Sequence, residues 1–77
     1  MELCQMCQHQ RTFRYDFDRR CCRARHALAM NKAMRQSRYA LVKAKHGEDA
    51  VRQLIGDVRQ LWEFYEGLRL AEGVGNG

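Results

Sequence analysis

The chain has 77 residues and a formal net charge of +5, with 14 basic and nine acidic residues, four cysteines and no proline. So short a chain forms one domain at most, and such domains usually need a metal, disulfides or association to be stable. No apolar run approaches the ~20 residues that span a bilayer, and the start of the chain has no signal-peptide features. We therefore expect a soluble cytoplasmic protein without a membrane partner, whose cysteines bind a metal or stay free.

The first 17 residues carry two cysteines, Cys4 and Cys7, and then an alternation of aromatic and polar side chains. Phe13, Tyr15 and Phe17 are separated by single polar residues. A period of two predicts a short strand or an extended arm, which would have to pair locally or lie over the helices.

Two helices are predicted in the middle of the chain. The first covers about residues 19–30, which are rich in alanine and arginine and follow Asp18, a good N-cap residue. The second covers about residues 32–46. Asn31 can cap its start, and Gly47 is expected to end it in the left-handed conformation.

The strongest periodic pattern predicts a long amphipathic helix in the last third of the chain. Its apolar residues recur at i, i+3, i+4 and i+7, and they are Val51, Leu54, Ile55, Val58, Leu61, Trp62, Tyr65 and Leu68. The short connection before this helix forces it antiparallel to the second helix. The expected fold is mainly α: residues 1–72 form one small three-helix or helical-hairpin domain with an N-terminal zinc knuckle, and residues 73–77 form a flexible tail.

The spacing of three cysteines and one histidine predicts a zinc site. Cys4 and Cys7 form a C-x2-C pair, which presents two thiolates from a tight turn. Cys22 follows after 14 intervening residues, and His26 lies one helical turn further on the same face. The pattern C-x2-C-x14-C-x3-H is typical of a closed structural site, in which four protein ligands hold Zn²⁺ and leave no position for a catalytic water.

Other interpretations of these residues remain open. Cys21 competes with Cys22, because adjacent helical residues point about 100° apart and should not both reach one ion without strain. His9 is a second alternative ligand. All four cysteines could instead be small buried apolar residues with inert thiols, and in an exported protein they would form two disulfides.

No catalytic set is apparent in the sequence. Ser37 is the only serine, and no glycine-rich phosphate loop precedes a predicted helix. The C-x2-C pair also lacks the βαβ context of a thioredoxin-like redox site. We therefore predict that the protein is not an enzyme.

Basic residues concentrate in the first half of the chain and give a candidate partner-binding face. Its members are Arg19, Arg20, Arg23, Arg25, Lys32, Arg35, Arg38 and Lys43. Such a face would meet an acidic protein surface or the phosphates of a nucleic acid, although the same charges also keep a small protein soluble. A homodimer is a further prediction, because the apolar stripe of the last helix exceeds what a small hairpin covers.

Four short stretches form a distinctive pattern: CRARHALAM at 22–30, RYALV at 38–42, HG at 46–47 and RQLW at 59–62. This pattern resembles an uncharacterised group of small cysteine-bearing proteins from phages and prophages of Gram-negative bacteria, over about residues 20–63. The resemblance implies a phage protein acting in the host cytoplasm, and small phage proteins commonly bind and block a host machine. We expect a zinc-binding protein that inhibits or modulates a host protein complex, for example as an anti-CRISPR; the alternative is a nucleic-acid-binding regulator.

Overall fold

The computed structural model describes residues 1–8 and 14–75, with side chains described as far as Arg69. Four helices occur in these ranges: α1 (Gln5–Gln8), α2 (Arg20–Ala29), α3 (Lys32–His46) and α4 (Glu48–Gly75). The predicted mainly α class is confirmed. The predicted strand is not formed: residues 14–16 have no regular structure and residues 17–19 turn into α2, while Phe13 lies outside the described residues.

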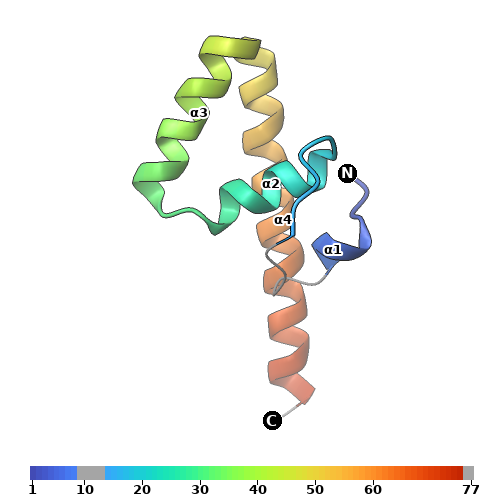
Figure 1. Ribbon diagram of the computed structural model, residues 1–77. Coiled ribbons are helices and arrows are strands. Elements are labelled where there is room, and N and C mark those ends of the chain that lie inside the picture. Colours follow the sequence, from blue (N-terminus) through green and yellow to red (C-terminus); the bar gives the residue numbers. More distant parts are fainter. Residues whose placement is uncertain (9–13, 76–77) are drawn as a thin grey trace.

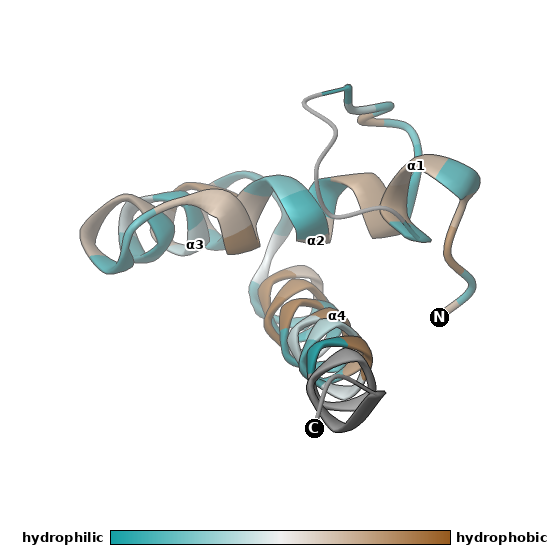
Figure 2. Ribbon diagram, turned by 90° about the horizontal axis from the view of Figure 1, so that it is seen from below, coloured by the Kyte–Doolittle hydropathy of each residue, from teal (hydrophilic) through white to brown (hydrophobic). Residues whose placement is uncertain are grey.

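The long helix α4 is the element on which the others pack. Figure 1 shows α3 rising to the turn at the top of the view, from which α4 descends; α2 crosses the middle of α4, and the second half of α4 extends away from the rest. Figure 2 shows α3, α2 and α1 in one row, with α4 foreshortened and extending away from that row. The molecule is accordingly elongated, with extents of 46 × 22 × 20 Å.

The start of α2 differs from the prediction. Arg19, not Asp18, occupies the N-cap position, in an extended conformation and without a side-chain capping hydrogen bond. Asp16 organises the turn instead: its carboxylate accepts hydrogen bonds from the backbone N–H of Asp18 at 3.1 Å and from Arg19 Nε at 3.2 Å. The carboxylate thus holds the turn before the helix and does not cap the first helical N–H groups.

The junction between α2 and α3 is held by side chains. Arg35 donates to three carbonyl oxygens at the end of α2, those of Ala27 at 3.0 Å, Leu28 at 3.1 Å and Met30 at 2.8 Å. The last carbonyls of a helix have no partner within it, and the guanidinium supplies one. Asn31 caps α3 as predicted, its Oδ1 accepting from the backbone N–H of Met34 at 2.8 Å.

The connection from α3 to α4 is also as predicted. Gly47 has φ of 93°, in the left-handed region that favours glycine, and its N–H donates to the Lys43 carbonyl at 3.0 Å. This tight turn places α4 antiparallel to α3 (Figure 1). At its other end α4 continues to Gly75, past residue 73 where the tail was predicted to begin; residues 76 and 77 lie outside the described part of the chain.

The apolar core lies between α2 and α4. Ala24 and Ala27 pack against the α4 residues Val58, Leu61 and Tyr65, and all five are buried. The two alanines let the helix backbones approach closely, so a short helix is anchored by the middle of a long one.

One edge of this core is polar, and α3 contributes little to it. Arg20 of α2 donates to both carboxylate oxygens of the buried Asp57 of α4, at 2.6 and 2.8 Å. Helix α3 buries no side chain fully.

None of the helices, over the residues searched, is long and apolar enough to cross a bilayer.

Candidate metal centre

Four cysteines come together where α1 meets the first turn of α2. Cys4 precedes α1, and its carbonyl accepts hydrogen bonds from the N–H groups of Cys7 at 3.0 Å and Gln8 at 3.1 Å. This tight turn brings the thiols of Cys4 and Cys7 to one side. Cys21 and Cys22 follow Arg20, the first residue of α2, and face them.

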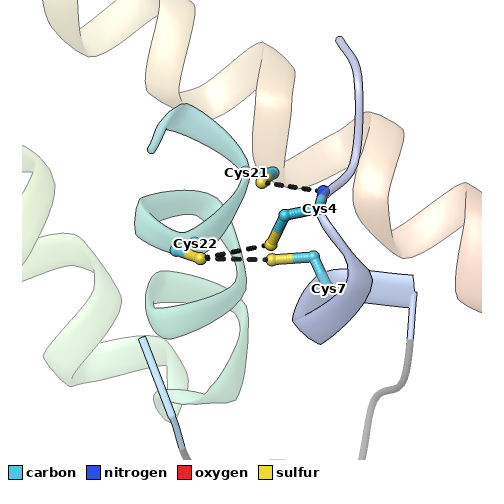
Figure 3. Close-up of side chains that lie close together, drawn as sticks. All are labelled: Cys4, Cys7, Cys21 and Cys22. Carbon is cyan, nitrogen blue, oxygen red and sulfur yellow. Dashed lines mark hydrogen bonds between the residues drawn. The ribbon is translucent and has the colours of Figure 1, made fainter. Parts of the chain in front are cut away.

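The four sulfur atoms form a compact group. Every Sγ lies within 4.8 Å of the other three. Figure 3 shows the thiols of Cys4 and Cys7 lying next to each other and facing Cys22 Sγ. Cys22 Sγ lies 3.6 Å from each of these two sulfurs, and the N–H of Cys4 is directed to Cys21 Sγ at 3.4 Å. All four cysteines are free, and these separations are far longer than the ~2.05 Å of a disulfide bond.

These separations match a tetrahedral metal site. Four sulfurs at about 2.3 Å from a central zinc ion lie about 3.8 Å from one another. The observed S–S distances of 3.6 Å and the 4.8 Å limit for the group bracket that value. The cluster could therefore hold a metal ion with small side-chain adjustments.

The cluster is enclosed by groups that complement negative charge. Cys7, Cys21 and Cys22 are buried. Arg25, itself only 3% exposed, donates from Nε to Cys7 Sγ at 3.3 Å. Its guanidinium lies 4.3 Å from the centre of the Tyr15 ring and also donates to the Arg14 carbonyl. A buried cation beside a sulfur favours the thiolate over the thiol, which is the form that binds metals.

A hydrogen bond from α4 completes the enclosure. The hydroxyl of Tyr65 donates to the carbonyl oxygen of Cys7 at 2.6 Å, so the longest helix is tied directly to α1. Burial raises the pKa of Tyr65 to about 12, and the neighbouring Cys7 adds to that rise. Tyr65 is therefore a neutral donor across the physiological range.

The thiols at the two ends of the C-x2-C pair differ in acidity. Burial raises the pKa of the Cys7 thiol well above its ordinary value, and the Arg25 hydrogen bond offsets only part of that rise. Burial also acts to raise the pKa of the Cys4 thiol. Hydrogen bonds from the Cys7 backbone and from the other thiols have the opposite effect, and the net result is a pKa lowered to about 7. Cys4 is accordingly the more acidic of the two, and a bound cation is needed to hold several buried thiolates together.

The structure brings together three of the four predicted ligands, Cys4, Cys7 and Cys22, and replaces the fourth. Cys21 occupies that place, whereas His26 packs its ring against the edges of Tyr15 and Phe17, with centroids 5.0 and 5.1 Å away. Burial, with a contribution from the charge of Arg38, lowers the pKa of His26. The other alternative, His9, lies outside the described residues.

The physical reason is the direction of α2 relative to α1. The side of α2 that faces α1 lies between the positions of Cys21 and Cys22. Both of their thiols therefore reach the thiols of Cys4 and Cys7. Arg25 lies one helical turn after Cys21 on the same side of α2, and it donates a hydrogen bond to Cys7. His26 points about 100° away from Arg25, toward residues 15–17. The sequence signal for this arrangement was the adjacent cysteine pair followed by an arginine at i+4.

Four of the eight predicted partner-binding residues form bonds within the protein. Arg20 pairs with Asp57, Arg25 lies beside the cysteines, and Arg35 caps the end of α2. Arg19 pairs with Asp16 at the surface. The remaining four form no ion pair with any described side chain, and they are Arg23, Lys32, Arg38 and Lys43.

The fold and this cluster define a small helical protein with a four-cysteine group that could hold a metal ion. Residues 19–64, more than half of the chain, match the Family of unknown function (DUF7696), and the chain belongs to that family. The match includes Cys21 and Cys22 but not Cys4 and Cys7. The comparisons with curated proteins and with solved structures gave no match.

Proposed function

We propose that the four cysteines bind one structural Zn²⁺ ion. Four thiolates suit zinc in a tetrahedral arrangement, and four protein ligands leave no open position for water or substrate. The ion would join α1 to α2 and add its binding free energy to the stability of a small core. Elemental analysis of protein purified without added metal tests this: one zinc per chain is expected, and stoichiometric iron or metal-free folded protein would refute it.

We further propose that the protein is an interaction module and not an enzyme. The observation that carries this is the apolar surface on α3 and α4. Met34 and Leu41 of α3 are 56% and 44% exposed, and Ile55 and Trp62 of α4 are 39% and 51% exposed. Ile55 and Trp62 share a shallow groove with Tyr39 of α3. Exposed aromatic and aliphatic side chains in a shallow groove are typical of protein-binding surfaces.

The partner proposed is a host protein complex, which this protein would inhibit or modulate, with an anti-CRISPR as the concrete form. Support comes from the resemblance of the sequence pattern to phage and prophage proteins. We propose that the protein acts in the host cytoplasm. A partner with an acidic rim around an apolar centre would suit both Trp62 and the unpaired lysines and arginines of α3.

A capture experiment with matched variants tests the protein-partner proposal. Tagged protein is incubated with nuclease-treated bacterial lysate, and the same is done with two variants: Trp62→Ala, and Asp49→Ala, which changes an exposed residue of α4 that does not line the groove. One partner complex should be retained by the parent and by Asp49→Ala and lost with Trp62→Ala. The proposal is contradicted if Trp62→Ala retains the complex as the parent does, or if the parent retains no complex. In a CRISPR-bearing strain, expression should restore plating of a targeted phage.

The second candidate is a nucleic-acid-binding regulator, and one observation favours it. Arg23, Lys32, Arg38 and Lys43 remain available as cations on α2 and α3. A protein that neutralises several phosphates loses orders of magnitude in affinity over a fourfold rise in salt. Steep salt dependence on unrelated sequences would support this alternative, and no binding at low salt would eliminate it.

A homodimer through the α3–α4 apolar surface is the simplest competing use of that surface. It would bury the same residues, Ile55 and Trp62, against a second copy. Light scattering over a range of concentrations distinguishes the cases, because a constant monomer mass rules out self-association. A dimer mass that Trp62→Ala abolishes would instead assign the surface to self-association.

A further inference from the structure

A pocket of about 270 Å³ is lined by residues of α2, α3 and α4. Figure 1 shows these three helices as the sides of a triangle. Three arginines line the pocket, Arg20 and Arg23 from α2 and Arg38 from α3, and so does His46 at the end of α3. The pocket lies wholly within the residues that match the family.

The charge in this pocket is not balanced by the protein. Asp57 is the only carboxylate in its lining, and both of its oxygens accept hydrogen bonds from Arg20. That pairing raises the pKa of Arg20 through the hydrogen bond and the charge of Asp57. Among the side chains that the structure describes, Arg23 and Arg38 form no ion pair. Two guanidinium groups thus border one cavity without a counter-charge from the protein, and their positive potential favours an anion there.

The rest of the lining sets the size and polarity of the occupant. Val42, Ala50 and Leu54 supply an apolar wall. The volume lies just below the ~300 Å³ at which pockets for drug-sized ligands begin. A compact organic molecule with one anionic group fits this combination, because a bare oxyanion would leave the apolar wall uncovered.

We propose that this pocket binds a small organic phosphate, held by the guanidinium groups of Arg23 and Arg38 and packed against Val42 and Leu54. Guanidinium groups present paired N–H donors that match phosphate oxygens. Arg20 is held by Asp57, and this ion pair gives the pocket a fixed side with no net charge. This site is separate from the cysteine cluster and does not depend on the metal or on the protein partner proposed above.

The test uses the whole 77-residue chain as purified and three probes at matched ionic strength: AMP, inorganic phosphate and adenosine. Calorimetry and thermal unfolding followed by circular dichroism give affinity and stabilisation. We expect saturable binding of AMP, weaker binding of phosphate and none of adenosine. Bound ligand should raise the unfolding temperature.

Matched variants locate the site. Arg38→Gln should lower the affinity for AMP by roughly tenfold or more, because it removes charge-assisted hydrogen bonds. Lys32→Gln, the same charge change on α3 outside the pocket, should leave affinity within about twofold. Without ligand, Arg38→Gln should be at least as stable as the parent, because it relieves like-charge repulsion.

Three outcomes would overturn the proposal. Equal losses from Lys32→Gln and Arg38→Gln would show non-specific attraction of anions to a basic protein. Tight binding of duplex DNA without binding of AMP would assign the arginines to a nucleic-acid backbone. No binding of AMP or phosphate to the parent would leave the charge as a surface feature only.

Discussion

Arg25 Nε lies 3.3 Å from Cys7 Sγ, which places a buried guanidinium against the most deeply enclosed part of the cysteine cluster. A site of four thiolates around a divalent ion carries a formal charge of −2, and burying it unpaired is costly. With an ion bound, Arg25 would offset part of that charge and fix the orientation of Cys7, as hydrogen-bond donors around metal sites generally do. Arg25 thus links α2 to the cysteine cluster through this hydrogen bond.

The first prediction concerns Arg25. Arg25→Gln should weaken zinc binding by about 10- to 100-fold, because loss of an outer hydrogen-bond partner typically has that effect. Competition with a chromophoric chelator measures the affinity. Arg25→Lys should fall between, since it keeps the charge but not the fork geometry. The exposed Arg23→Gln is the control, and equal weakening in both variants would mean that total charge alone matters.

The second prediction separates the ligands from their neighbours. Cys21→Ser should lower metal affinity about as much as Cys22→Ser, whereas His26→Ala should leave metal content at one ion per chain. The reason is that Cys21 belongs to the sulfur group and His26 packs on Tyr15 and Phe17. Cobalt-substituted protein reports the ligands directly through its thiolate charge-transfer absorption. Full metal binding by Cys21→Ser together with loss in His26→Ala would show that the ligand set deduced from the structure is wrong.

The third prediction concerns reactivity after metal removal. Cys4, half-buried and with its pKa lowered to about 7, should be alkylated first near neutral pH, because the thiolate is the reacting form. Cys7, buried and with a raised pKa, should react last. Peptide mapping by mass spectrometry at short reaction times gives the order. Zinc should protect all four thiols; uniform labelling of the metal-free chain would mean that the cluster disperses without the ion.

The fourth prediction concerns Tyr65. Tyr65→Phe should lower the free energy of unfolding by about 1–3 kcal/mol, because the buried Cys7 carbonyl loses its donor. The folded pKa of about 12 lies above the unfolded value near 10. The hydroxyl's contribution is therefore complete below pH 10 and lost as pH rises toward 12.

Denaturant unfolding at several pH values checks both parts of this prediction. The stability gap between the parent and Tyr65→Phe should narrow between pH 10 and 12. A gap that stays constant over this range would show that the hydroxyl is not the titrating group.

The helices could be predicted from local sequence because the signals that define them are local. Asn31 and Gly47 bound α3 as expected, since capping and the left-handed C′ position depend on one or two residues. The periodic apolar residues of α4 gave its existence and direction. Its exposed members, such as Ile55 and Trp62, could not be told from its buried ones, because the stripe is wider than the surface that α2 and α3 cover.

The sequence by itself determined that the chain is helical and that a C-x2-C pair and a later cysteine belong to one cluster, because spacing within a turn or a helix fixes which thiols can meet. Only the tertiary structure decided that Cys21, and not His26, joins the cluster, and that Arg20, Arg25 and Arg35 bond to Asp57, Cys7 and the end of α2. The physical reason is rotation: each residue along α2 turns about 100°, so the angle at which α2 meets α1 and α4 selects which side chains face the sulfur atoms. That angle is set by packing of Ala24 and Ala27 on α4, which no local pattern encodes.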